Sequence, residues 1–140
     1  MERRLFIPGL LVVIACVAIV LQGQTAPEAR TRIVFSQSLP NLDATHLKVT
    51  TIEVTYPPGG SSTPHSHPCP VIGYVLRGAV RMQVEGGPVS VYRPGDSFYE
   101  APNGVHMVSA NASTKEPAVF LAYFTCDHAG PLSVKVPHKP

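Results

Sequence analysis

The chain has no tryptophan and little charge. Only 14% of its 140 residues are charged, and 11 Lys and Arg side chains against 9 Asp and Glu give a formal net charge of +2. A nucleic-acid-binding domain needs a basic patch that neutralises phosphates, and this sequence carries none. The composition therefore argues against a nucleic-acid partner and favours a small neutral or weakly charged ligand.

Helix signals are also scarce. Beyond residue 26, no window combines helical periodicity with helix caps, so we expect little helix. Short apolar and β-branched runs alternate instead with turns rich in Gly, Pro and Asn, which predicts an all-β sandwich or barrel. The run at residues 118–124 is apolar throughout and predicts a strand covered on both faces. The expected strands are residues 33–35, 47–56, 71–76, 80–84, 89–92, 97–99, 105–109 and 118–126.

The one long apolar run lies at the N-terminus. Arg3 and Arg4 precede an apolar stretch that ends at Leu21, and polar residues follow, which is the pattern of a secretory signal peptide in residues 1–26. The rival interpretation is an uncleaved membrane anchor over residues 5–21, which is short for a bilayer span. We expect an exported protein, periplasmic or secreted, with one domain at 27–140, a core at about 33–126 and a C-terminal tail at 127–140.

Two cysteines follow the apolar segment, Cys69 and Cys126. An oxidising compartment would allow a disulfide between them, but the count alone does not establish one. Cys69 lies two residues after a histidine, so a thiolate close to a metal is a second alternative. The interpretation that the sequence favours is a small, half-buried residue in a loop.

Three histidines have the spacing of metal ligands. Residues two apart on a strand point to the same side, so His65 and His67 can direct two imidazoles at one point. His106 would supply a third imidazole from a neighbouring strand and leave other coordination positions open. The remaining histidines, His46, His128 and His138, are expected on the surface or in the tail.

The residues around these histidines resemble the two motifs of the cupin superfamily. The first motif is matched by Gly59, His65, His67 and Gly78, and the second more loosely by Gly95, Pro102, Gly104, His106 and Asn111. The resemblance implies a double-stranded β-helix, or jelly-roll barrel, with one metal ion inside. It also implies a homodimer.

The chain departs from the first motif at the carboxylate ligand. Val71 stands where these cupins usually have a glutamate, which would leave three neutral imidazoles and a more strongly Lewis-acidic metal. Glu100 is a candidate replacement, because it lies six residues before His106 and would share its side of a straight strand. Glu100 could equally act as a general base or be a solvated charge at a strand end.

The sequence favours an exported mononuclear metal enzyme of the dioxygenase type that acts on a small organic molecule. His65, His67 and His106 would hold the metal, with Fe(II) favoured and Mn, Ni, Cu or Zn as alternatives, and Glu100 would be the catalytic base. A second hypothesis is a non-redox isomerase, cyclase or lyase. A third is a cupin that binds a metal or a small ligand without catalysis. A membrane contact is expected only through an uncleaved N-terminal segment.

Overall fold

The computed structural model describes residues 29–136, and every regular element in that range is a β-strand. The strands are β1 (Lys48–Tyr56), β2 (His65–Ser66), β3 (Val71–Arg77), β4 (Val80–Val84), β5 (Ser90–Tyr92), β6 (Ser97–Glu100), β7 (Val105–Asn111), β8 (Ala118–Cys126) and β9 (Val134–Lys135). The all-β prediction is confirmed. The predicted signal or anchor segment, residues 1–26, and His138 lie outside the described range. Between residues 29 and 136 there is no helix of the length and hydropathy that a membrane span requires.

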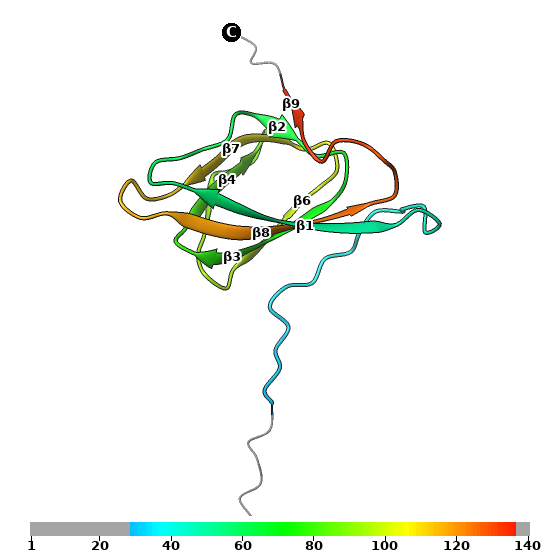
Figure 1. The fold of residues 1–140 in the computed structure, drawn as a ribbon, viewed down its shortest axis with the longest axis horizontal. Coiled ribbons are helices and arrows are strands. Elements are labelled where there is room, and N and C mark those ends of the chain that lie inside the picture. Colours follow the sequence, from blue (N-terminus) through cyan, green and yellow to red (C-terminus); the bar gives the residue numbers. More distant parts are fainter. Residues whose placement is uncertain (1–28, 137–140) are drawn as a thin grey trace, which may run out of the picture. The chain divides into compact units, whose positions relative to one another are not determined.

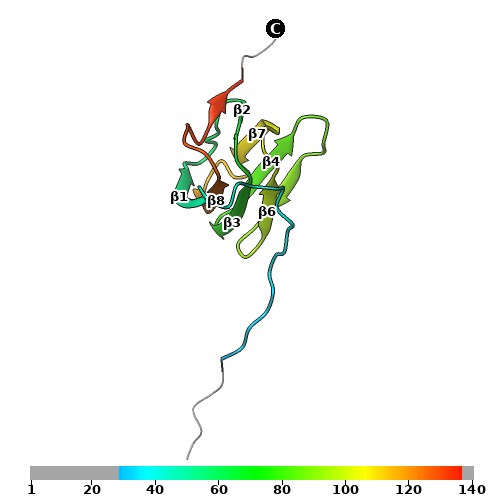
Figure 2. The ribbon, with the colours of Figure 1, turned by 90° about the vertical axis from the view of Figure 1, so that its right-hand side faces the viewer.

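The strands form two antiparallel sheets whose inner faces enclose the core (Figure 1). One sheet has the order β1-β8-β3-β6 and the other the order β5-β4-β7-β2-β9. Figure 2 shows the same two layers from the side. Neighbouring strands are distant in the sequence, as in β8 between β1 and β3, so the chain crosses repeatedly between the layers. This is the predicted jelly-roll barrel.

Alternating side chains place the core between the sheets. Along β8 every second residue from Ala118 to Cys126 is buried, and the residues between them are half-buried. Strand β3 alternates in the same way over Val71, Gly73 and Val75. Within one copy of the chain, only the inner face of β8 meets the opposite layer. Cover of its outer face by the second subunit of the expected homodimer stays a prediction.

The predicted strand at residues 33–35 is also absent. These residues form no regular structure, and Ile33 is 87% exposed. Three apolar residues followed by the polar Ser36 and Gln37 offer neither an alternating face nor a pairing partner. The first strand of the barrel is β1.

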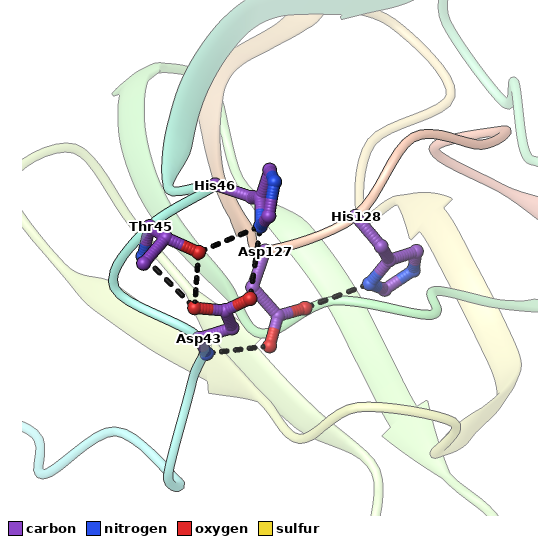
Figure 3. A network of polar contacts seen from close by, with 5 residues as sticks. All are labelled: Asp43, Thr45, His46, Asp127 and His128. Carbon is purple, nitrogen blue, oxygen red and sulfur yellow. Dashed lines mark hydrogen bonds and ion pairs between the residues drawn. The ribbon is translucent and has the colours of Figure 1, made fainter.

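A polar network fastens the segment before β1 to the end of β8 (Figure 3). Asp127 accepts a hydrogen bond from the backbone N–H of Asp43 at 2.9 Å. Asp43 in turn accepts one from the hydroxyl of Thr45 and contacts Nδ1 of His46 at 2.8 Å, while His128 contacts Asp127 at 2.7 Å. The hydrogen bonds from Thr45 and His46 lower the pKa of Asp43. His46 and His128 are thus surface residues, as expected.

The C-terminal segment carries more structure than its prolines indicate. Strand β9 pairs with β2, with Lys135 opposite His65 and Val134 opposite Ser66. The backbone N–H of Val136 also donates to the carbonyl of Pro64 at 3.2 Å. The segment after Asp127 therefore completes the sheet that carries the histidines.

Candidate metal centre

Strands β2 and β7 bring the three histidines together. His65 lies directly opposite His106 in the antiparallel pair, and His67 follows at the end of β2. The ring centroids of His65 and His67 are 4.8 Å apart, and those of His65 and His106 are 5.4 Å apart. The third separation, between His67 and His106, is 5.5 Å. The three imidazoles thus form one cluster, as their spacing predicts.

Glu100 reaches the same cluster from the opposite sheet. It ends β6 and pairs directly with Val71 on β3, and both side chains are buried, at 6% and 1% exposure. Cross-strand partners on one face have Cβ atoms about 4.5 to 5.5 Å apart. A buried carboxylate therefore lies directly beside Val71, the position at which the first motif lacks one.

The donor atoms converge without hydrogen-bonding to one another. Oε2 of Glu100 lies 3.3 Å from Nε2 of His67 and 3.3 Å from Nε2 of His106. One donor atom from each of these three residues lies within 4.8 Å of the others, and His65 is not a member of this tightest group. Within residues 29–136, Oε2 of Glu100 and both ring nitrogens of His106 are buried with no hydrogen-bond partner.

These orphaned atoms fit a metal ion. Two ligand atoms that each lie about 2.1 Å from one ion are roughly 3.0 Å apart when the angle between them at the ion is a right angle, and roughly 3.4 Å apart when it is tetrahedral. The 3.3 Å from Oε2 of Glu100 to each histidine Nε2 falls in that range. Buried polar atoms without partners are costly, and one cation would satisfy Oε2 of Glu100 and Nε2 of His106, although not Nδ1 of His106 on the other side of the ring. A mixed set of imidazole and carboxylate donors suits Fe(II), Mn(II), Ni(II) or Zn(II).

Burial changes the pKa values at this centre in the metal-free protein. It raises the pKa of Glu100 from 4.5 to about 8. Burial also lowers the pKa of His106 to about 4, and the neighbouring His67 and His65 lower it further. The pKa of His67 is lowered by burial as well. At neutral pH the metal-free site therefore holds His67 and His106 as neutral imidazoles, ready to ligate, and a protonated Glu100 that must release its proton to do so.

Two backbone carbonyls fix the orientation of the imidazoles. Nδ1 of His67 lies 2.6 Å from the carbonyl of Leu132, and Nδ1 of His65 lies 2.8 Å from the carbonyl of Thr63. Since a carbonyl can only accept, each Nδ1 carries the proton and each Nε2 keeps its lone pair for a ligand. Sequence reasoning missed Leu132, because a backbone carbonyl leaves no signal in residue type.

A disulfide joins Cys69 to Cys126, with their Cα atoms 5.1 Å apart. It ties the segment just after His67 to the end of β8. The thiolate alternative and the favoured unpaired loop cysteine are both replaced by this covalent link. Cys126 is distant in the sequence, and the pairing depends on the register of β8 beside β3.

The metal centre opens into a cavity of about 190 Å³ between the two sheets. Its metal-side wall includes His65, His67 and Glu100. The other walls are mostly apolar residues of β1 and β8 together with three hydroxyl side chains, and Leu132 and Ser133 form part of the rim. A small organic molecule can therefore lie against the ligands on one side and the apolar wall on the other.

Comparison with known proteins identifies the family. The cupin domain family matches residues 52–124, while a search of curated protein sequences found no match. A cupin-like protein from Thermotoga maritima is 31% identical, with a TM-score of 0.56 over 63% of this chain and 64% of that one.

Two enzymes have a similar fold. Oxalate decarboxylase from Bacillus subtilis, described with Mn(II) centres, is 30% identical, with a TM-score of 0.53 over 63% of this chain and 24% of that one. A DMSP lyase from Ruegeria pomeroyi is 23% identical, with a TM-score of 0.55 over 62% and 42%, and shows the fold alone. The chain thus matches less than two thirds of each of these three proteins. The family match, which covers the strands that carry the histidines and Glu100, shows that this chain belongs to the cupin domain family.

Proposed function

We propose that this chain is a mononuclear metal enzyme that acts on a small, oxygen-bearing organic molecule. The observation that carries the proposal is the buried, unpartnered convergence of His67, Glu100 and His106 beside a cavity. His65 is proposed as the fourth ligand, because its Nε2 has no hydrogen-bond partner within residues 29–136 and its ring lies 4.8 Å from that of His67. A purely structural metal would have no use for the adjoining cavity.

The chain's own residues prepare the site for substrate. The carbonyls of Leu132 and Thr63 hold the Nε2 atoms of His67 and His65 toward the centre. Glu100, when ionised, places one negative charge there, and the apolar side chains of β1 and β8 give the substrate a surface to pack against. A divalent metal bound at these residues would supply a Lewis acid with positions open to substrate. Four ligands with one carboxylate leave a net positive centre that attracts an anionic oxygen.

Two reaction classes remain for this centre. The sequence favours dioxygenase-type oxidation with Fe(II). The second class, non-redox lyase or isomerase chemistry, is favoured by a specific observation: the 30% identity to an oxalate decarboxylase, a lyase. Glu100 also places a carboxylate beside the histidines, so the ligand set is not limited to the three neutral imidazoles expected from the sequence. We therefore place the lyase class first, with Mn(II) or Fe(II) as the metal.

One experiment separates these classes from a non-catalytic binding role. The purified protein is loaded in turn with Fe(II), Mn(II) and Zn(II), and small carboxylates, diketones and catechols are offered with and without O₂. Turnover of a carboxylate under anaerobic conditions supports the lyase class. Oxygen consumption that requires Fe(II) would support the dioxygenase instead. A fully loaded protein that turns over nothing would favour a binding protein.

Export and self-association are further parts of the proposal. The Cys69–Cys126 disulfide is typical of an oxidising compartment, which supports a periplasmic or secreted protein, with an anchor at residues 5–21 as the alternative. The outer face of β8, with Val119, Leu121 and Tyr123 half-buried, is proposed as part of a homodimer interface. Mass spectrometry of the mature N-terminus and sedimentation of the purified protein test these two points.

A further inference from the structure

Three hydroxyl side chains meet inside the cavity, away from the metal ligands. The hydroxyl of Tyr56 lies 2.7 Å from Oγ of Ser62 and 2.8 Å from Oγ of Ser109. Tyr56 and Ser109 are each only 6% exposed. The three residues come from β1, from the loop before β2 and from β7, and all three line the cavity beside the metal centre. We call them the hydroxyl cluster.

The hydroxyl cluster has hydrogen-bonding capacity to spare. Three hydroxyl groups carry three protons, and the two contacts among them use two. Neither serine side chain has another partner among the residues that the structure describes. One O–H group is therefore left to donate, and several lone pairs are left to accept. Tyr56 and Ser109 are buried while Ser62 is exposed, so the cluster can meet a ligand in the cavity and is reached by water on its Ser62 side.

The cavity has an ordered layout from the metal centre to the hydroxyl cluster. Phe124 packs edge-on against His67, with centroids 5.2 Å apart, and Phe120 packs against Tyr56 at 5.8 Å. Ala122 lies between the two phenylalanines on the same face of β8, and its small side chain leaves the space open. The cavity therefore has one polar end at the metal ligands, an apolar middle and a second polar end.

The register of β7 indicates the distance between the two ends. His106 pairs with Val84 and Ser109 pairs with Met82. The metal ligand His106 and the hydroxyl residue Ser109 are therefore separated by the length of two residues along β4. At about 3.4 Å per residue this is roughly 7 Å. The cavity volume of about 190 Å³ equals that of roughly six water molecules at about 30 Å³ each. A ligand that fills it is a short chain on the order of six or seven non-hydrogen atoms.

We propose that the hydroxyl cluster recognises the end of the substrate remote from the metal. The substrate class is a short aliphatic carboxylate with a hydroxyl or carbonyl group at its other end. This inference rests on the proposed function, since the carboxylate would face the positive metal centre while the second polar group bonds to Ser109, Ser62 or Tyr56. The apolar middle, around Ala122, would contact the carbon chain.

Binding of two matched probes tests the proposal. Metal content of the Mn(II)-loaded protein is measured first, and 4-hydroxybutyrate and butyrate are then titrated by calorimetry. We expect the hydroxylated probe to bind about tenfold more tightly, as one well-placed hydrogen bond allows. Ser109→Ala and Tyr56→Phe should reduce this preference to twofold or less with unchanged metal content. Ala122→Leu should weaken both probes at least tenfold, because it fills the middle of the cavity.

The outcomes separate this proposal from the one on which it rests. A protein that retains no Mn(II), Fe(II) or Zn(II) refutes the metal enzyme, and the substrate class with it. A metal-loaded protein that binds both probes equally refutes the recognition role alone. The same holds if the preference survives in both hydroxyl variants. Thermal unfolding identifies a variant that misfolds, in which case the other variant decides, since a purely structural role would change stability without changing the preference between probes.

Discussion

Moving the carboxylate back to the position of the usual cupin ligand tests how the metal centre is built. Val71 and Glu100 are direct partners across the β3–β6 pair, and both are buried. We compare Glu100→Val, which removes the carboxylate, with the double variant Val71→Glu/Glu100→Val, which exchanges the two side chains. The exchange keeps the summed side-chain volume of the pair unchanged, so the core should tolerate it.

The expected magnitudes follow from the contacts of Glu100. Its Oε2 lies 3.3 Å from the Nε2 atoms of both His67 and His106. Loss of a residue that merely supports a metal ligand weakens metal binding by 10-fold to 100-fold, and loss of a ligand should cost at least about 100-fold, or roughly 2.8 kcal/mol. In the double variant the new carboxylate begins about 5 Å from the old position. It should recover at least about tenfold of the loss, or roughly 1.4 kcal/mol.

Metal affinity is measured by competition with a chromophoric chelator, and unfolding curves are recorded for the same samples. Glu53→Val is the matched control, because Glu53 is exposed on β1 and should leave the affinity unchanged. Wild-type affinity in Glu100→Val would refute the role of Glu100 as a ligand. A folded double variant that binds metal no better than Glu100→Val would refute the argument that positions 71 and 100 are interchangeable.

Three further predictions concern pH, the disulfide and the β3–β6 pair. Burial raises the pKa of Glu100 from 4.5 to about 8, so the folded metal-free protein keeps a proton that the unfolded chain has released. The melting temperature of the metal-free protein should therefore fall as pH rises from 6.5 to 8. Metal binding at pH 7 should release close to one proton, which calorimetry in buffers of different ionisation enthalpy measures. Cys69→Ser should lower the free energy of unfolding by about 4 kcal/mol in urea titrations, because the Cys69–Cys126 link closes a long loop; an unchanged midpoint would contradict this. Gly73→Ala should destabilise the fold by about 1 to 3 kcal/mol, since the added Cβ would overlap the ring of Phe98. Chemical denaturation measures this loss, and an unchanged midpoint would refute the prediction by showing that the ring moves aside without cost.

Local pattern was sufficient to predict β1, the strands from β3 to β8 and the histidine cluster, but it missed the two-residue strand β9 and did not give β2 a range of its own. The alternation of Val80, Met82 and Val84 with polar residues, and the spacing of His65 and His67, depend only on neighbours along the chain. The same reasoning failed at residues 33–35, where a run of three apolar residues has no partner strand. A short apolar run therefore predicts a strand only where the fold supplies a partner, as it does for residues 97–99 and does not for residues 33–35.

The fourth ligand needed information that local pattern does not contain. Glu100 was a candidate because its separation from His106 is even, yet the relation that matters is its pairing with Val71 across two strands. The carbonyl of Leu132 and the contact between Tyr56 and Ser109, which lie 53 residues apart, depend on the closed barrel in the same way. The register between paired strands determines these three contacts, and the packing of the whole chain determines that register.

One irregularity in β7 explains how the metal centre and the hydroxyl cluster share a strand. His106 and Ser109 are three residues apart, so a regular strand would turn them to opposite faces. The pairing with β4 slips by one residue at Met107, which has no partner and is 41% exposed. This bulge restores the inward direction, and both His106 and Ser109 are buried. Bulges of this kind are over-represented beside active sites, where they redirect a side chain. In this chain the bulge lets one strand supply a candidate metal ligand, His106, at one end of the cavity and a hydrogen-bonding group, Ser109, at the other.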